Sequence, residues 1–192
     1  MIYPSAHTGR FIAVVGPSGV GKDSVMNGLL AAEPRYVRCR RVITRPEDAG
    51  GEDFEGVSEA EFKARVDRGY FALWWRAHGL AYGIPAASTN DALEAGMDVL
   101  ANLSRAIVHE AWSVFPTLTV LSITAPVEVL EKRLERRGRE DEDDIAARLA
   151  RPIRALPQGV PLISIDNSGD LDGSVREARM ALARRLSHAA SV

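Results

Sequence analysis

Cysteine is almost absent from this sequence, with Cys39 the only one among 192 residues. An intrachain disulfide is therefore excluded, and thiolates cannot form a metal cluster. Neither sign of charge dominates, because 24 Lys and Arg stand against 26 Asp and Glu. No basic excess therefore points to nucleic acid. No apolar run approaches the ~20 residues that span a bilayer, and no signal-peptide pattern opens the chain. We expect a soluble cytoplasmic protein with no membrane or nucleic-acid partner, while its oligomeric state stays open.

Short apolar runs alternate with helical patterns along the chain. The runs are Phe11–Val15, Met97 to Leu103, Leu118 to Ile123 and Pro161 to Ile165. Helical spacing of apolar residues follows the first run, from about Lys22 to Ala32, and the last, from Gly173 to Leu186. Such alternation predicts parallel strands joined by helical crossovers. The expected fold is therefore α/β, with three layers around a parallel core sheet.

Two stretches depart from this alternation. Residues 40–88 are rich in Gly, Arg and aromatics, and are expected to form an inserted subdomain that binds an acceptor. Residues 133–154 carry dense charge of both signs around Gly138, which suits a helical lid. The remaining ranges 10–39, 89–132 and 155–188 would form the core of a single domain.

A glycine-rich segment follows the first apolar run and opens the first helix. Residues 16–22 read Gly-Pro-Ser-Gly-Val-Gly-Lys and fit the phosphate-binding pattern G-x-x-x-x-G-K. In such a loop the backbone N–H groups and the helix N-terminus hold the phosphates of ATP, and Lys22 reaches the β- and γ-phosphates. The alternative is a plain glycine turn. The expected ATP-binding residues are Gly16, Pro17, Ser18, Gly19, Val20, Gly21, Lys22, Asp23 and Ser24.

Asp23 stands where this pattern usually has the Ser or Thr that holds Mg²⁺. A carboxylate is also a hard oxygen ligand, so Asp23 is our candidate for Mg²⁺ bound with ATP, directly or through water. The alternative is an acidic residue that only favours the helix dipole.

The expected lid supplies arginines. Arg133 and Arg137 lie four residues apart on a helix predicted from Val127 to about Arg137, whose Val127, Leu130 and Leu134 would pack on the core. Arg148 lies on the next helix. Phosphoryl transfer needs cations around the moving group, so these three arginines are catalytic candidates together with Lys22. The alternative is a solvated face in which the arginines pair with the acidic residues 140–144.

Several motifs occur in the order seen in guanylate kinases, which the chain resembles from Phe11 to about Leu186. They are GPSGVGK at 16–22, ITRP at 43–46, VSxxEF at 57–62, HGxxYG at 78–83 and RLxxRG at 133–138. The resemblance implies a nucleoside-monophosphate kinase fold and ATP-dependent chemistry. It also implies that Asp166 and Asn167 hold the adenine edge, although a simple turn is the alternative.

The parts of that family that read guanine are missing. Leu73 stands where the family has a glutamate, Phe54 where it has a tyrosine, and Ile84 where it has Ser or Thr. Guanine's donors would stay unpaired against Leu73, at a cost of ~1–3 kcal/mol. These departures indicate an acceptor without a guanine base.

The chain resembles a sister family more fully, the ribose 1,5-bisphosphate phosphokinases of phosphonate breakdown. The shared segments are GKDS at 21–24, RVITR at 41–45, AG at 49–50, ALxW at 72–75, NxSR at 102–105 and RGRE at 137–140. The resemblance implies ATP-dependent phosphorylation of ribose 1,5-bisphosphate to 5-phosphoribosyl 1-diphosphate, with ADP released. The acceptor candidates are Arg41, Thr44, Arg45, Tyr82 and Arg139. Asn102 and Arg105 join them, because ligands bind at the carboxyl ends of core strands; helix capping is their alternative role.

The implied nucleophile is a phosphate oxygen, which is already ionised at pH 7, so no general base is needed. Two rival functions remain at this stage. One is a guanylate or other nucleoside-monophosphate kinase, and the other is a non-catalytic binding module with a guanylate kinase-like fold.

Overall fold

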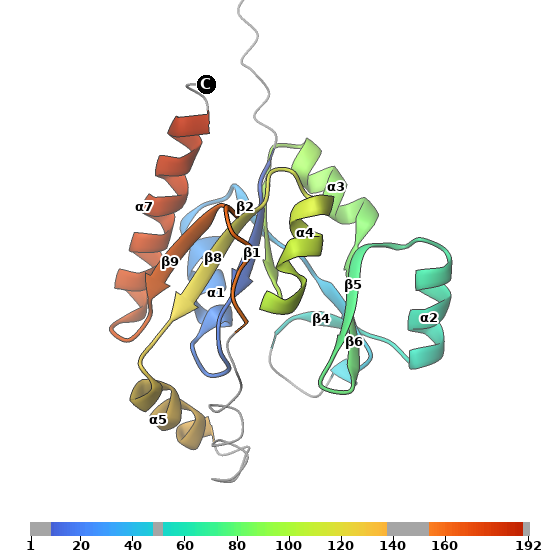
Figure 1. The fold of residues 1–192 in the computed structure, drawn as a ribbon, viewed down its shortest axis with the longest axis horizontal. Coiled ribbons are helices and arrows are strands. Elements are labelled where there is room, and N and C mark those ends of the chain that lie inside the picture. Colours follow the sequence, from blue (N-terminus) through green and yellow to red (C-terminus); the bar gives the residue numbers. More distant parts are fainter. Residues whose placement is uncertain (1–8, 48–51, 138–153, 190–192) are drawn as a thin grey trace, which may run out of the picture. The chain divides into compact units, whose positions relative to one another are not determined.

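The computed structural model describes residues 9–47, 52–137 and 154–189 of the protein. Its strands are β1 (Phe11–Val15), β2 (Tyr36–Arg38), β3 (Arg41–Ile43), β4 (Phe54–Gly56), β5 (Phe71–Ala77), β6 (Leu80–Pro85), β7 (Asp98–Asn102), β8 (Thr119–Thr124) and β9 (Leu162–Asp166). Its helices are α1 (Lys22–Ala32), α2 (Glu59–Asp67), α3 (Ala86–Glu94), the 3₁₀ turn η2 (Arg105–Ile107), α4 (Val108–Val114), α5 (Val127–Arg137) and α7 (Leu171–Ala189), as drawn in Figure 1.

Five strands form the core sheet, in the order β2-β7-β1-β8-β9. β2 pairs with β7 in parallel, and β8 pairs with β9 in parallel. β1 lies at the centre, and all five of its residues are buried, as expected for a strand covered on both faces. The prediction of an α/β fold with a parallel core sheet is confirmed.

The contacts divide the chain into two compact units, which are described separately. The first unit comprises Met1–Ile12, Arg35–Ala101 and His109–Leu118, and the second comprises Ala13–Pro34, Asn102–Val108 and Thr119–Val192. The second unit carries the glycine-rich loop, α1, β8, α5, β9 and α7.

In the second unit, α1 packs against α7 through a glycine. A Cβ added to Gly28 would lie 2.4 Å from a methyl carbon of Val175 on α7, so a side chain there would force the two helices apart. Val25, Met26 and Leu29 are the buried residues of α1, whereas Ala32 is exposed at its end. This tight helix pair fixes the helix whose first residue is Lys22.

The first unit contains a second sheet, in the order β4-β3-β6-β5. β5 and β6 form an antiparallel hairpin whose turn is His78-Gly79, and both turn residues have positive φ, 53° and 73°. On one face of this sheet, Val42 and Ala81 pack against Phe62 of α2. The other face carries the side chains considered below.

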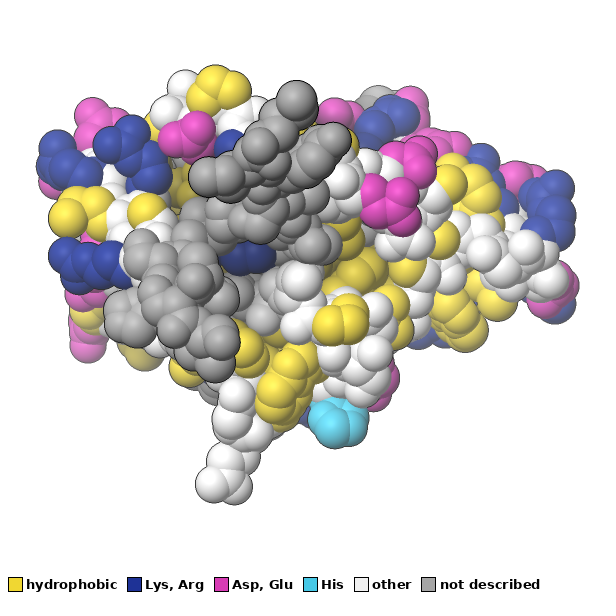
Figure 2. Space-filling model, turned by 90° about the horizontal axis from the view of Figure 1, so that it is seen from above, with side chains coloured by type: hydrophobic (Ala, Val, Ile, Leu, Met, Phe, Trp, Pro, Cys, Tyr) yellow, Lys and Arg dark blue, Asp and Glu magenta, His cyan; other side chains and the backbone are white. Residues whose placement is uncertain are grey.

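The surface carries both signs of charge in close proximity. On the face shown in Figure 2, Lys and Arg side chains lie beside Asp and Glu side chains, consistent with the net charge of −2. Among the helices that the structure describes, none is both long and apolar enough to cross a bilayer.

Candidate active site

The loop after β1 has the backbone that its glycines permit. Gly19 and Gly21 have φ of 81° and 91°, a conformation that residues with a side chain rarely adopt. Gly21 caps the N-terminus of α1. A Cβ at Gly16 would lie 2.5 Å from the carbonyl oxygen of Ile123 on β8, so the loop also runs tightly against the end of that strand. These positions require glycine for reasons of geometry.

Lys22 folds back over this loop. Its Nζ donates to the carbonyl oxygens of Gly16, at 2.9 Å, and Pro17, at 3.0 Å. The ammonium group is therefore held beside the loop that would receive the phosphates, and a short movement would bring it to them.

Asp23 follows in the first turn of α1 and is partly buried, while Ser24 is exposed. Among the described residues, no group of three or more His, Cys, Asp or Glu could hold a metal ion. A lone carboxylate beside a phosphate-binding loop nevertheless fits Mg²⁺, which typically takes one or two carboxylates and completes its shell with water and substrate phosphates. The donor set at Asp23 is therefore compatible with Mg²⁺ brought by ATP.

Asn167 also lies against this loop. Its side chain is buried, and Nδ2 donates to the carbonyl oxygen of Val20 at 2.8 Å. A Cβ at Gly21 would lie 2.7 Å from that Nδ2. Asn167 thus supports the loop directly. Asp166 is exposed, and its Oδ1 accepts from the N–H of Ser168 at 2.8 Å, which stabilises the turn after β9.

α5 brings one of the arginines predicted for the lid to the loop. Arg133 Nη1 donates to the carbonyl oxygen of Val20 at 3.4 Å. Leu130 and Leu134 are buried, as predicted. Val127 is 52% exposed, so its predicted packing on the core is wrong, because it begins the helix and points to solvent. Arg137 is the last residue of α5, and its side chain lies outside the described part, as do Arg139 and Arg148 entirely.

The end of β7 supplies two further candidates in the second unit. The N–H of Leu103 donates to the carbonyl oxygen of Val14, which sets the end of β7 beside the end of β1. Arg105 Nη2 donates to Ser122 Oγ at 2.9 Å, and burial lowers the pKa of this guanidinium, which stays charged at neutral pH. Asn102 is partly buried at the strand end. Ser104 caps η2, because its Oγ accepts from the N–H of Ala106.

The acceptor candidates of the first unit gather on the face of the small sheet opposite α2. Trp75 and Tyr82 are direct cross-strand partners, and their rings stack at 5.3 Å between centroids. The Arg41 guanidinium lies over both rings, at 5.7 Å and 5.1 Å. Arg45 lies over the ring of Phe54 at 4.5 Å. Aromatic rings therefore orient both arginines.

Arg41 also has a charged partner that the sequence did not reveal. Its Nε donates to Glu52 Oε2 at 3.1 Å, and its Nη2 pairs with Glu52 Oε1. Thr44, by contrast, bonds to the backbone: its Oγ1 accepts from the N–H of Ala81 at 2.8 Å and so joins the end of β3 to β6. Thr44 thus helps to shape, through the backbone, the sheet face that carries Arg41, Trp75 and Tyr82, which is the candidate acceptor face.

The positions that depart from guanine recognition lie on this same face. Leu73 and Ile84 are cross-strand partners, two residues along from Trp75 and Tyr82, and both are buried. This end of the face is consequently apolar.

Comparison with known proteins decides the family. The guanylate kinase family model matches residues 8–175. The chain belongs to the guanylate kinase family. Within this family, it is 53% identical over 172 residues to ribose 1,5-bisphosphate phosphokinase PhnN of Ruegeria sp., covering 89% of this chain and 90% of that protein. It is 48% identical to the protein of the same name from Rhizobium etli, covering 87% and 86%. The resemblance to ribose 1,5-bisphosphate phosphokinases is confirmed.

A third relative is longer. The chain is 46% identical to a bifunctional ribose 1,5-bisphosphokinase-thymidine phosphorylase of Cupriavidus necator, over 86% of this chain but only 28% of that protein. Among solved structures, guanylate kinase from Anaplasma phagocytophilum is similar with a TM-score of 0.68, at 20% identity, over 93% of this chain and 87% of that one. This structural likeness confirms the guanylate kinase fold.

Proposed function

We propose that this kinase transfers the γ-phosphoryl group of ATP to the 1-phosphate of ribose 1,5-bisphosphate, giving 5-phosphoribosyl 1-diphosphate and ADP. The chain combines a phosphate-binding loop with a small-sheet face that carries Arg45 and the Arg41–Glu52 pair. This face also buries Leu73 and Ile84, where a purine would need hydrogen bonds, and this observation carries the proposal. The names of the relatives at 48% and 53% identity support the same substrate.

In the proposed nucleotide half, the N–H groups of residues 16–22 and the N-terminus of α1 bind the phosphates of ATP. Lys22 leaves its carbonyl partners for the β- and γ-phosphates. Asp23 would hold Mg²⁺, which would neutralise phosphate charge when bound. Asn167 keeps the loop in shape through Val20, and Arg133, Arg137 and Arg148 neutralise the charge of the transferring group.

In the proposed acceptor half, Arg45, Tyr82 and Arg139 bind phosphates of the sugar, and Thr44 maintains the loop that carries Arg45. Asn102 and Arg105 lie at the carboxyl end of β7, and Ser122 orients Arg105. An oxygen of the 1-phosphate attacks the γ-phosphorus, and the bond to the β–γ bridging oxygen breaks. The nucleophile is already ionised, so catalysis rests on positioning and on charge neutralisation.

The test is to identify the product by phosphorus NMR after ATP, Mg²⁺ and ribose 1,5-bisphosphate are mixed with the protein. We expect a diphosphate ester on C1 and stoichiometric ADP. GMP in place of the sugar should give less than about a hundredth of the rate, since its donors would face Leu73 unpaired. Strong turnover of GMP would overturn the assignment in favour of a guanylate kinase, and no turnover of either would favour a binding module.

A further inference from the structure

Arg41 and Glu52 form a nearly buried ion pair on the acceptor face. The Arg41 side chain is 7% exposed and the Glu52 side chain 11%. Two hydrogen bonds join them, one from Nε and one from Nη2, so the guanidinium and the carboxylate lie edge to edge. The guanidinium also lies over the stacked rings of Trp75 and Tyr82. Both members of the pair are thereby fixed before any ligand arrives.

The charge of this pair argues against phosphate as its ligand. Glu52 compensates the positive charge of Arg41, and its own oxygens would repel a phosphate placed beside them. The neighbouring Arg45 has an aromatic partner, Phe54, at 4.5 Å. An uncharged part of the acceptor, with hydroxyl groups to donate, suits the Arg41–Glu52 pair better, because an ionised carboxylate is a strong acceptor and nothing else.

The proposed acceptor offers only one such part. Between its phosphates, ribose 1,5-bisphosphate has free hydroxyls at C2 and C3 of the ring, and its C–H groups suit the flat surface of an aromatic side chain. A carboxylate whose position is locked by a fork-like arginine can accept from neighbouring hydroxyls with little loss of freedom on binding.

We propose that Glu52, held by Arg41, binds the ribose hydroxyls of the acceptor and makes the enzyme select ribose over 2-deoxyribose. Arg45 then binds phosphate while the Arg41–Glu52 pair binds the sugar ring. This inference rests on the proposed function, since it concerns the acceptor of that reaction.

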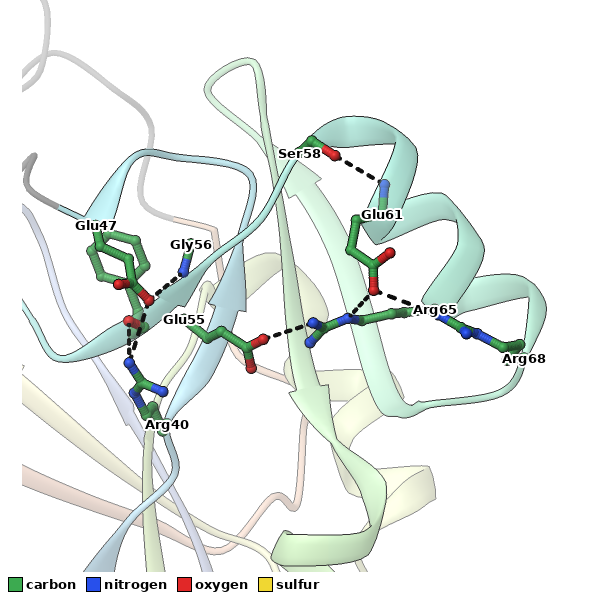
Figure 3. Close-up of polar contacts among 9 residues, drawn as sticks. Arg40, Glu47, Glu55, Gly56, Ser58, Glu61, Arg65 and Arg68 are labelled. Carbon is green, nitrogen blue, oxygen red and sulfur yellow. Dashed lines mark hydrogen bonds and ion pairs between the residues drawn. The ribbon is translucent and has the colours of Figure 1, made fainter.

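The experiment compares kcat/KM for ribose 1,5-bisphosphate with that for 2-deoxyribose 1,5-bisphosphate. The wild type should prefer the ribose substrate by at least about tenfold, and Glu52→Gln should reduce this preference about tenfold or more. A purely structural Glu52 would lower both values together and leave their ratio unchanged. Glu55→Gln is the matched control. Glu55 pairs with Arg65 of α2 at 2.7 Å (Figure 3), on the sheet face that packs against α2.

A second variant guards against loss of the fold. Replacing the pair together, Arg41→Met with Glu52→Leu, leaves no lone buried charge and should also lose the preference. An unchanged ratio in the folded variant, or a wild type that does not distinguish the two sugars, would overturn the inference. If the wild type turned over neither sugar, the proposed function itself would have failed, so the two failures give different results.

Discussion

Cys39 lies in a closed environment at the end of β2. Its Sγ is 3.9 Å from the Thr89 hydroxyl, and burial raises the pKa of the thiol from 9.0 to about 11. Between these two values the unfolded chain loses the thiol proton while the folded chain keeps it. The contribution of the Cys39 thiol to the free energy of unfolding is therefore fully present below pH 9 and is lost as the pH rises toward 11.

At pH 10.5 we expect the titration of this thiol to lower the free energy of unfolding by about 2 kcal/mol, relative to pH 8. Urea unfolding in the presence of a reductant measures the free energy of unfolding at both values. Cys39→Ala is the comparison, because other groups that titrate in this range act in both proteins. The wild type should lose about 2 kcal/mol more than the variant; equal losses would contradict the burial argument.

Asp98 connects three segments of the first unit. It begins β7 and is fully buried. It accepts from the backbone N–H of Arg10 at 2.9 Å and from the side chains of Arg10 and Arg35. Asp98→Ala would leave two arginines without their buried partner. We expect a loss of about 3–5 kcal/mol in the free energy of unfolding.

The matched control for this prediction is Asp67→Ala on α2. Asp67 pairs with Lys63 at 2.6 Å, but both side chains are more than half exposed. Exposed pairs are worth at most about 1 kcal/mol. Chemical denaturation of both variants makes the comparison, and similar losses would show that the Asp98 cluster contributes little.

At the scale of elements, α1 and four of the five core strands were predictable, whereas the core strand β2 and the small sheet were not. β1 is a continuous apolar run, and α1 begins and ends where its pattern predicted, because both features are local. β3 and β4 are three residues each and include Arg41, Glu55 and Gly56. They form strands only through pairing with distant segments, which no local pattern reports.

In the candidate site too, the local features were predictable and the long-range contacts were not. The glycines and Lys22 follow each other in sequence, so their loop was predictable. The partners of Arg41, Asn167 and Arg105 were not, because Glu52, Val20 and Ser122 are brought to them by the fold. Glu52 had no signal in the sequence, since it is one of several acidic residues in a glycine-rich stretch.

For the molecule as a whole, nucleotide binding tests whether the glycine-rich loop binds ATP, against the alternative that the protein is a non-catalytic binding module. A non-hydrolysable ATP analogue with Mg²⁺, at a hundred times its Kd, should stabilise the fold by about 2.7 kcal/mol. In a protein of this size, that raises Tm by roughly 5–10 °C in calorimetry.

Lys22→Ala should lose most of this rise in Tm, and chelation of Mg²⁺ should reduce it in the wild type. Lys63→Ala, on the exposed surface of α2, should keep it. Because Lys22 also bonds to Gly16 and Pro17, each protein is compared with its own ligand-free Tm. An equal shift in Lys22→Ala and the wild type would show that nucleotide binds without the loop lysine, which the proposed mechanism does not allow.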